Sequence, residues 1–227
     1  MCYIKSSILG LVLLFLTSNI GAQANEQALS MSYKFKDGIY LSYESWKNDM
    51  PDYEWEEVNT RLASNPKTFI AQVEYIYLKE DKEALLIEKV WGICLAGVPY
   101  IRLDASETAY SATAFAGLKA RGKINYFSYR KEIEEKVVIK AYNPLTRKPF
   151  RKGEVPTIKE VVIEKMFLFD DGKVVDFNYV NLLLWIEDDA QLKESVFELS
   201  PQEIDEKLYK CLLIYNDRNK VNIPVSY

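Results

Sequence analysis

A hairpin pattern in the middle of the chain decides the fold class, and it reads Lys89-Val90-Trp91-Gly92-Ile93-Cys94-Leu95, Ala96-Gly97, Val98-Pro99-Tyr100-Ile101-Arg102-Leu103. β-branched and aromatic residues, which favour strands, fill both runs. Ala96-Gly97 separates them, and a two-residue connection that ends in glycine is typical of a tight hairpin turn. The pattern therefore predicts an antiparallel pair of strands.

Further strands are expected on both sides of this hairpin, bounded by turn residues such as Asp37-Gly38 and Asp171-Gly172. The polar stretch 59–67 is expected to interrupt them. Residues 143–156 hold three prolines and a group of basic residues, which predicts a long exposed loop. The predicted strands cover 32–36, 39–41, 69–78, 112–118, 124–130, 137–142, 158–169 and 173–177.

Helix signals lie at 43–48, capped by Ser42, and in the last quarter of the chain. Asn178 is placed to cap a helix over 180–188. Ser200-Pro201-Gln202-Glu203 is a strong start signal, because it joins a capping serine, a proline at the first helical position and a glutamate that reaches back. We therefore predict one α+β domain over residues 25–227, a mainly antiparallel sheet with a short N-terminal helix and two or three C-terminal helices packed on it.

The composition excludes several classes of site. The chain has 227 residues, 48% hydrophobic, with 29 basic and 33 acidic side chains and no histidine. The absence of histidine excludes Ser-His-Asp and Cys-His catalysis and imidazole-ligated metal sites. The scattered glycines form no phosphate-binding loop, and no serine lies in a nucleophile-elbow context. We expect no cofactor and no metal site.

The N-terminal segment Met1 to Ala24 has the features of a secretory signal peptide. It carries one charge, Lys5, ahead of a nine-residue apolar run that is too short to span a membrane. Ala22-Gln23-Ala24 suits a signal peptidase, so we expect cleavage before Asn25. The only nearby cysteine precedes the apolar run, which argues against a lipid anchor. The protein is therefore expected in the periplasm or outside the cell, with no transmembrane segment in the mature chain.

Cleavage removes only one charged residue, so the 29 basic side chains become 28 against 33 acidic ones, a net charge of −5. The densest basic group, at 147–152, is interrupted by proline and is interpreted as a solvated turn. Nucleic acid is therefore rejected as a partner, since phosphate binding needs a concentrated positive face. Cys94 and Cys211 both lie among apolar residues, and the sequence leaves a disulfide and two buried free thiols open.

A resemblance rests on the order Asp37-Gly38-Ile39-Tyr40-Leu41-Ser42-Tyr43-Glu44-Ser45-Trp46, followed by Val90-Trp91-Gly92-Ile93-Cys94 and Gly97-Val98-Pro99-Tyr100-Ile101. These motifs resemble a set of uncharacterised exported proteins of Bacteroidota. The resemblance implies export and a single domain. It implies no activity and no site residues, because the motifs consist of packing and turn residues.

Two groups of acids and one group of aromatics are the candidate functional residues. Residues 54–57 and 187–189 combine carboxylates with nearby aromatics, as a carbohydrate hydrolase requires, although solvated acids explain them more simply. Asp170-Asp171-Gly172 is better explained as a hairpin turn than as a calcium loop. The candidate binding residues are Tyr43, Trp46, Tyr53 and Trp55, for which core packing is the alternative.

Three functions are compatible with these patterns. The leading hypothesis is a non-catalytic exported protein that binds an unknown protein or glycan of the cell envelope. The first alternative is a histidine-free hydrolase that acts on a carbohydrate through two carboxylates. The second alternative is a structural envelope subunit, which would show an exposed apolar patch or an unpaired sheet edge.

Overall fold

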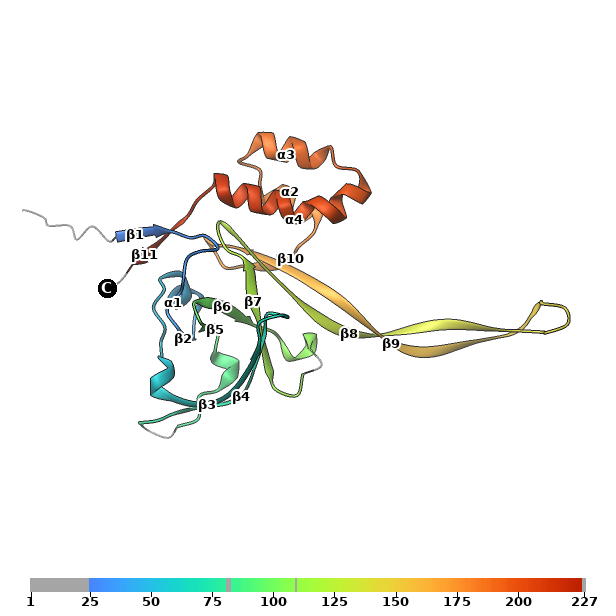
Figure 1. The fold of residues 1–227 in the computed structure, drawn as a ribbon, viewed down its shortest axis with the longest axis horizontal. Coiled ribbons are helices and arrows are strands. Elements are labelled where there is room, and N and C mark those ends of the chain that lie inside the picture. The colour runs from blue at the N-terminus through green and yellow to red at the C-terminus, as the bar shows by residue number, and fades with distance from the viewer. Residues whose placement is uncertain (1–24, 81–82, 109, 226–227) are drawn as a thin grey trace, which may run out of the picture.

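The computed structural model describes residues 25–80, 83–108 and 110–225, and within them the chain has the predicted α+β fold (Figure 1). A nine-stranded antiparallel sheet has the order β10-β9-β8-β7-β6-β5-β2; β4 also pairs with β7, and β3 with β4. The strands are β1 (Asn25–Ala28), β2 (Gly38–Tyr40), β3 (Val58–Asn65), β4 (Ile70–Leu78), β5 (Gly92–Leu95), β6 (Val98–Arg102), β7 (Thr113–Ala120), β8 (Ile124–Tyr142), β9 (Pro149–Leu168), β10 (Val174–Asp176) and β11 (Asn222–Val225). The α-helices are α1 (Tyr43–Lys47), α2 (Tyr179–Trp185), α3 (Ala190–Phe197) and α4 (Pro201–Arg218), and three short 3-10 helices are η1 (Trp55–Glu57), η2 (Ile87–Lys89) and η3 (Ala105–Glu107).

The two ends of the described chain pair with each other. β1 and β11 form a separate two-stranded antiparallel sheet. The expected cleavage point lies directly before β1, and the expected signal peptide itself lies outside the described residues.

The predicted hairpin is confirmed as β5 and β6. Ala96 and Gly97 both have positive φ, 53° and 77°, as a tight two-residue turn requires. The Asp37 carboxylate accepts hydrogen bonds from both of their amides, at 3.0 and 2.8 Å. The turn is therefore stabilised by Asp37, which belongs to the segment directly before β2.

The predicted helix starts are also confirmed. Ser42 accepts from the amide of Ser45 at the start of α1, and Asn178 caps α2. At α4, the Ser200 side chain accepts from the Glu203 amide, and the Glu203 side chain accepts from the Ser200 amide. These boundaries follow from local sequence, because a cap satisfies backbone donors within its own first turn.

Two predictions near the N-terminus are wrong. Residues 32–36 are irregular instead of a strand, because side chains replace the ladder: the Tyr33 hydroxyl and the Lys36 amide donate to buried Asp49, at 2.7 and 2.8 Å. The polar stretch 59–67 belongs largely to β3. It reads as polar because most of its side chains face solvent, while Val58 and Leu62 pack against the core.

The largest correction concerns residues 137–158. The sequence predicts a short strand, a long loop and another strand, whereas β8 and β9 are continuous strands of 19 and 20 residues joined by a turn over 143–148. They form a ribbon that leaves the body of the protein (Figure 1). The prolines and basic residues of this part suggested a loop. No surface of the body covers it, so its side chains do not alternate between buried and exposed positions, which is the pattern that reveals a strand.

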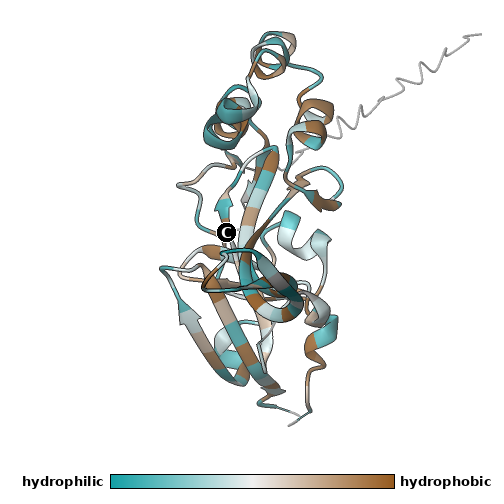
Figure 2. Cartoon of the chain, turned by 90° about the vertical axis from the view of Figure 1, so that its right-hand side faces the viewer, coloured by the Kyte–Doolittle hydropathy of each residue, from teal (hydrophilic) through white to brown (hydrophobic). Residues whose placement is uncertain are grey.

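Three clusters of buried side chains make the core. One surrounds Trp46 beneath α1, a second lies in the part of the sheet that carries β3 and β4, and the third joins the sheet to α2, α3 and α4. Cys94 belongs to the first cluster and Cys211 packs against the third; both are free thiols. Figure 2 shows the helices stacked on one end of the strands, with apolar stretches along the strands of the body.

Trp46 is the largest fully buried side chain, with 1% of its surface exposed, and its ring contacts Phe35, Trp91 and Phe167. We expect Trp46→Ala to lower the free energy of unfolding by about 3–5 kcal/mol, because it leaves a cavity in the first cluster. Leu184→Ala, at an exposed position of α2, should change it by less than about 0.5 kcal/mol. Urea unfolding measures both; equal losses would contradict this placement of the core.

Candidate functional site

The four aromatic residues predicted as a binding surface lie in two different clusters. Trp46 is buried, and Tyr43 is half-buried beside it, with its hydroxyl donating to the Phe169 carbonyl. Tyr53 and Trp55 pack against the cluster near β3, where the indole of Trp55 donates to the Cys94 carbonyl at 2.9 Å. These contacts attach α1 and η1 to the sheet. The four aromatics therefore serve packing and do not form one binding surface.

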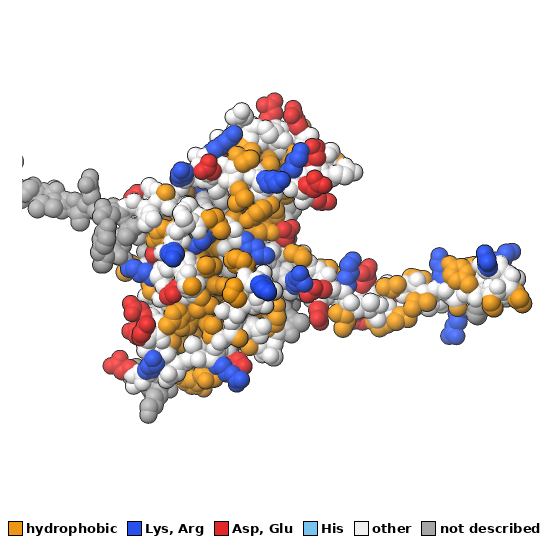
Figure 3. All heavy atoms as spheres, viewed as in Figure 1, with side chains coloured by type: hydrophobic (Ala, Val, Ile, Leu, Met, Phe, Trp, Pro, Cys, Tyr) orange, Lys and Arg blue, Asp and Glu red, His pale blue; other side chains and the backbone are white. Residues whose placement is uncertain are grey.

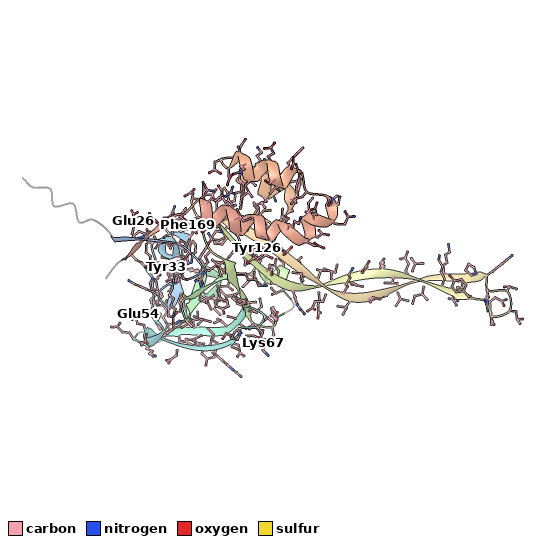
Figure 4. All side chains as sticks on the ribbon, turned by 45° about the horizontal axis from the view of Figure 1, so that its top comes forward. Glu26, Tyr33, Glu54, Lys67, Tyr126 and Phe169 are labelled. Carbon is pink, nitrogen blue, oxygen red and sulfur yellow. The ribbon has the colours of Figure 1, made fainter. Side chains whose placement is uncertain are left out.

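The first predicted group of acids, at 54–57, is used for local structure. Glu57 accepts from the Glu54 amide at 2.7 Å, which closes the start of η1. Glu54 and Glu56 are exposed, and Glu54 lies on the side of the body away from the ribbon (Figure 4).

The second predicted group, at 187–189, also has structural partners. Asp188 accepts from Lys123 and from the Tyr215 hydroxyl, which connects the turn between β7 and β8 to α4. Asp189 caps α3 and pairs with Arg218. Neither this group nor the first supplies two acids to one hollow among those found in the described residues.

One hollow does combine two carboxylates with aromatic side chains, and the sequence patterns did not indicate it. It lies between β9 and α4, where Glu164 and Asp205 share a lining with Phe177, Tyr179 and Tyr209. Glu164 already accepts a hydrogen bond from the Tyr126 hydroxyl (Tyr126 is labelled in Figure 4). The two acids are 41 positions apart in the sequence and lie on different elements. Their spacing along the chain therefore could not show that they line one hollow.

A lysine and a serine also meet near the start of the ribbon. The Lys119 ammonium donates to Ser128 Oγ at 2.6 Å, and burial lowers the pKa of Lys119, while Glu164 opposes this shift. A Ser-Lys pair can form a nucleophile, but the nucleophile must reach its substrate. Ser128 is only 4% exposed and lies near the start of β8, so we assign this pair to the packing of β7 against β8.

The most distinctive surface is the part of the ribbon beyond the body, residues 131–161, which we call the arm. β7 pairs with β8 only at Tyr126 and Phe127, and β10 pairs with β9 only between Lys165 and Phe167. None of the described arm side chains is buried. Since a strand rises about 3.4 Å per residue, the arm extends roughly 40 Å from the body.

One face of the arm carries a contiguous apolar stretch. Side chains that are paired across an antiparallel ladder point to the same face. Val137 pairs with Val155 and Ile139 pairs with Gly153, and both valines are 43% exposed. A Cβ placed on Gly153 would have no neighbour within 4 Å, so this face is open. We call this the apolar face: it carries Ile133, Val137, Ile139, Ala141, Gly153 and Val155, together with Glu135, Arg151, Thr157 and Lys159.

The two edges of the arm differ. On β9 the even-numbered residues direct their backbone groups outward, because the Glu164 carbonyl accepts from Phe177 beyond the ribbon and no register shift separates Glu164 from Pro156. Pro156 therefore interrupts the outer edge of β9, since proline has no N–H to donate. β8 has no proline between Arg130 and Tyr142, so its outer edge presents an unbroken row of donors and acceptors.

Charge is segregated along the arm. Residues 136–153 contain no acidic side chain, whereas acidic residues predominate nearer the body. The exposed side chain of Leu145, 92% accessible, lies in the turn at the tip. Figure 3 shows hydrophobic side chains along the arm and basic ones near its end. The basic residues of 136–153 are Lys136, Lys140, Arg147, Lys148, Arg151 and Lys152.

Comparisons with known proteins give no match to a family model, to a curated protein or to a solved structure. Within the described ranges no helix is long and apolar enough to span a membrane. No group of three or more potential metal-ligating Cys, Asp or Glu side chains occurs in the same ranges. The arm is the feature of the described residues from which a function can be inferred.

None of the described residues of the arm belongs to the three core clusters. We expect replacement of residues 132–160 by Asn-Gly, which joins the paired residues Lys131 and Val161 through a tight turn, to leave the body folded. The free energy of unfolding should change by less than about 1 kcal/mol, measured by urea unfolding. A collapse of the near-ultraviolet circular dichroism signal would contradict this separation of arm and body.

Proposed function

We propose that the chain is a non-catalytic interaction protein of the cell envelope, exported by the signal expected over Met1 to Ala24, and that the arm makes its contact. The observation that carries this proposal is a 19- and 20-residue ribbon whose outer part has an apolar face and free edges. A partner that binds the arm would cover the apolar face and the free edges, which the body leaves uncovered.

The arm is an unfavourable structure for a protein to expose to water, and this supports the assignment. A two-stranded ribbon is at best marginally stable in water by itself, because it lacks a covered apolar face. Unpaired edges and exposed aliphatic side chains also favour aggregation, and proteins generally protect them. An arm that keeps both features is explained by a function that uses them. The same two features were the expected signs of a structural envelope subunit, so within the class of interaction proteins we favour a role in assembly.

A carbohydrate hydrolase is the second candidate, and one observation favours it. The hollow between β9 and α4 contains Glu164 and Asp205 beside three aromatic rings that could stack on sugar. Release of reducing sugar from a polysaccharide by the parent chain, lost in both Glu164→Gln and Asp205→Asn, would favour this candidate over the first. The hydrogen bond from Tyr126 to Glu164 gives the acid a structural role as well, which is why we place it second.

Photo-crosslinking in living cells tests the role of the arm. A benzophenone amino acid is introduced at Ile158, an arm position that is 70% exposed, or at Leu184, a body position of similar exposure. We expect adducts from Ile158 and few from Leu184, and the crosslinked chain should begin at Asn25. Adducts from Leu184 alone, or none from the arm at the natural expression level, would refute the proposal.

A further inference from the structure

Four charged side chains of β8 in the arm have no ion-pair partner among the described residues: Lys131, Glu132, Glu134 and Lys140. Lys131 and Glu132 lie at the base of the arm, and Glu134 and Lys140 lie farther out. Two ion pairs lie within the arm: Lys136 Nζ is 3.9 Å from Glu154 Oε2, and Lys159 Nζ is 3.7 Å from Glu135 Oε2. Glu134 and Lys140 are on the same face of the ribbon, because they are separated by an even number of positions.

Val137 lies midway between Glu134 and Lys140. If two β8 strands pair antiparallel about a two-fold axis through Val137, Glu134 of each copy faces Lys140 of the other. These two charges, which have no ion pair in the single chain, are then matched, twice. A two-fold interface has this reciprocity by symmetry, because a contact from one residue to another is repeated in reverse.

We infer that two copies of this chain associate through the outer edges of their β8 strands, antiparallel and with Val137 on the two-fold axis, to form a four-stranded sheet from two arms. This inference rests on the proposed function, in which the arm is the contact element, and it names the partner as a second copy. The even-numbered backbone groups of β8 would bond across the seam, as in the addition of a strand to a free edge.

Each neighbouring register places like charges against each other. An axis through Lys136 pairs Glu132 with Lys140 but sets Lys136 against its own copy. An axis through Glu135 pairs Glu134 with Lys136 but sets Glu135 against its own copy. An axis through Val138 would set Lys136 against Lys140. Like charges directly opposite each other destabilise a strand pair.

The register through Val137 also matches the rest of the arm. Val137 meets its own copy and Ile133 meets Ala141, so these aliphatic side chains gain lateral aliphatic neighbours on the apolar face, while Glu135 lies opposite Ile139. The basic outer part of each arm lies beside the more acidic base of the other. The outer edge of β9, interrupted by Pro156, offers no comparable row.

A lipid surface is the other occupant that a basic and apolar arm tip could serve. It would engage the tip, around Leu145, and it would leave Glu134 without a partner. The order of charges along β8 is explained by a second copy and not by an anionic membrane, so we assign the edge to the second copy.

Val137 and Val155 provide a matched pair of positions for the test. They face each other across the arm and have the same exposure, 43%. In the inferred dimer the two Val137 Cα atoms are about 4.5 Å apart, within the range of a disulfide. The two Val155 Cα atoms are separated by three strand spacings, roughly 14 Å, which a disulfide cannot span.

Under mild oxidation we expect Val137→Cys to form a covalent dimer and Val155→Cys to remain mostly monomeric, on a non-reducing gel. The parent chain controls for Cys94 and Cys211, and circular dichroism confirms that each variant is folded. Sedimentation of the parent chain should show a reversible monomer–dimer equilibrium.

Charge reversal gives a second test that does not depend on cysteine. Glu134→Lys or Lys140→Glu alone sets like charges against each other twice, so each should weaken the dimer about tenfold. The double variant restores the pairs with reversed polarity and should return the dissociation constant to within about threefold of the parent value.

Three results would overturn the inference: equal crosslinking from Val137→Cys and Val155→Cys, no rescue by the double charge reversal, or a chain that stays monomeric at all concentrations. Binding of that monomer to vesicles of anionic phospholipid would identify the lipid surface as the occupant instead. Each of these results leaves the arm as the contact element. The proposed function fails separately, if arm positions give no adducts in cells.

Discussion

The antiparallel ladder between β8 and β9 is the interaction on which the rest of the structure depends. At its inner end the two strands carry buried side chains, Phe127 on one and Phe167 on the other, and the helices pack on the same strands. At its outer end the same ladder continues without any covering element. Backbone hydrogen bonds alone do not explain this continuation, because a bare two-stranded ribbon gains little net stability in water.

The continuous ladder also fixes where the outer residues of the arm lie relative to the body. The inner rungs are fixed by the core, so the outer rungs hold Glu134, Val137 and Lys140 in one register relative to the body. A flexible loop of the same composition would have to pay the entropy of ordering when it met a partner. The preformed arm avoids most of that cost. The body, with its free thiols and capped helices, then serves as the support from which the arm extends.

The sequence predicted the parts of the fold that are determined locally. The Ala96-Gly97 turn and the caps at Ser42 and Ser200 could be identified because each satisfies its own backbone within a few residues. Burial of Cys94 raises the pKa of its thiol, which agrees with a packing residue, but only the fold shows that Cys211 lies in a different cluster. That Glu164 and Asp205 line the same hollow likewise depends on how β9 packs against α4.

The arm was missed for a physical reason. Periodicity reveals a strand when one face is buried, and the arm has no buried face. The remaining signal was weak but present: β-branched residues on both sides of the turn around Asn143 and Pro144, including Val137, Ile139 and Val155. The prolines at 149 and 156 pointed to a loop, whereas a ribbon with a solvent-facing edge accommodates Pro156. The aromatic group of the N-terminal half was easier to see and proved to be placed against the core.

Amide hydrogen exchange resolved by NMR at several protein concentrations tests the central claim most directly. If the β8 edge is the contact surface between copies, the outward amides of Glu134, Lys136 and Val138 should slow with rising concentration. The corresponding outward amides of β9, at Lys152, Glu154 and Ile158, should stay fast throughout. Equal and concentration-independent exchange on both edges would contradict the account.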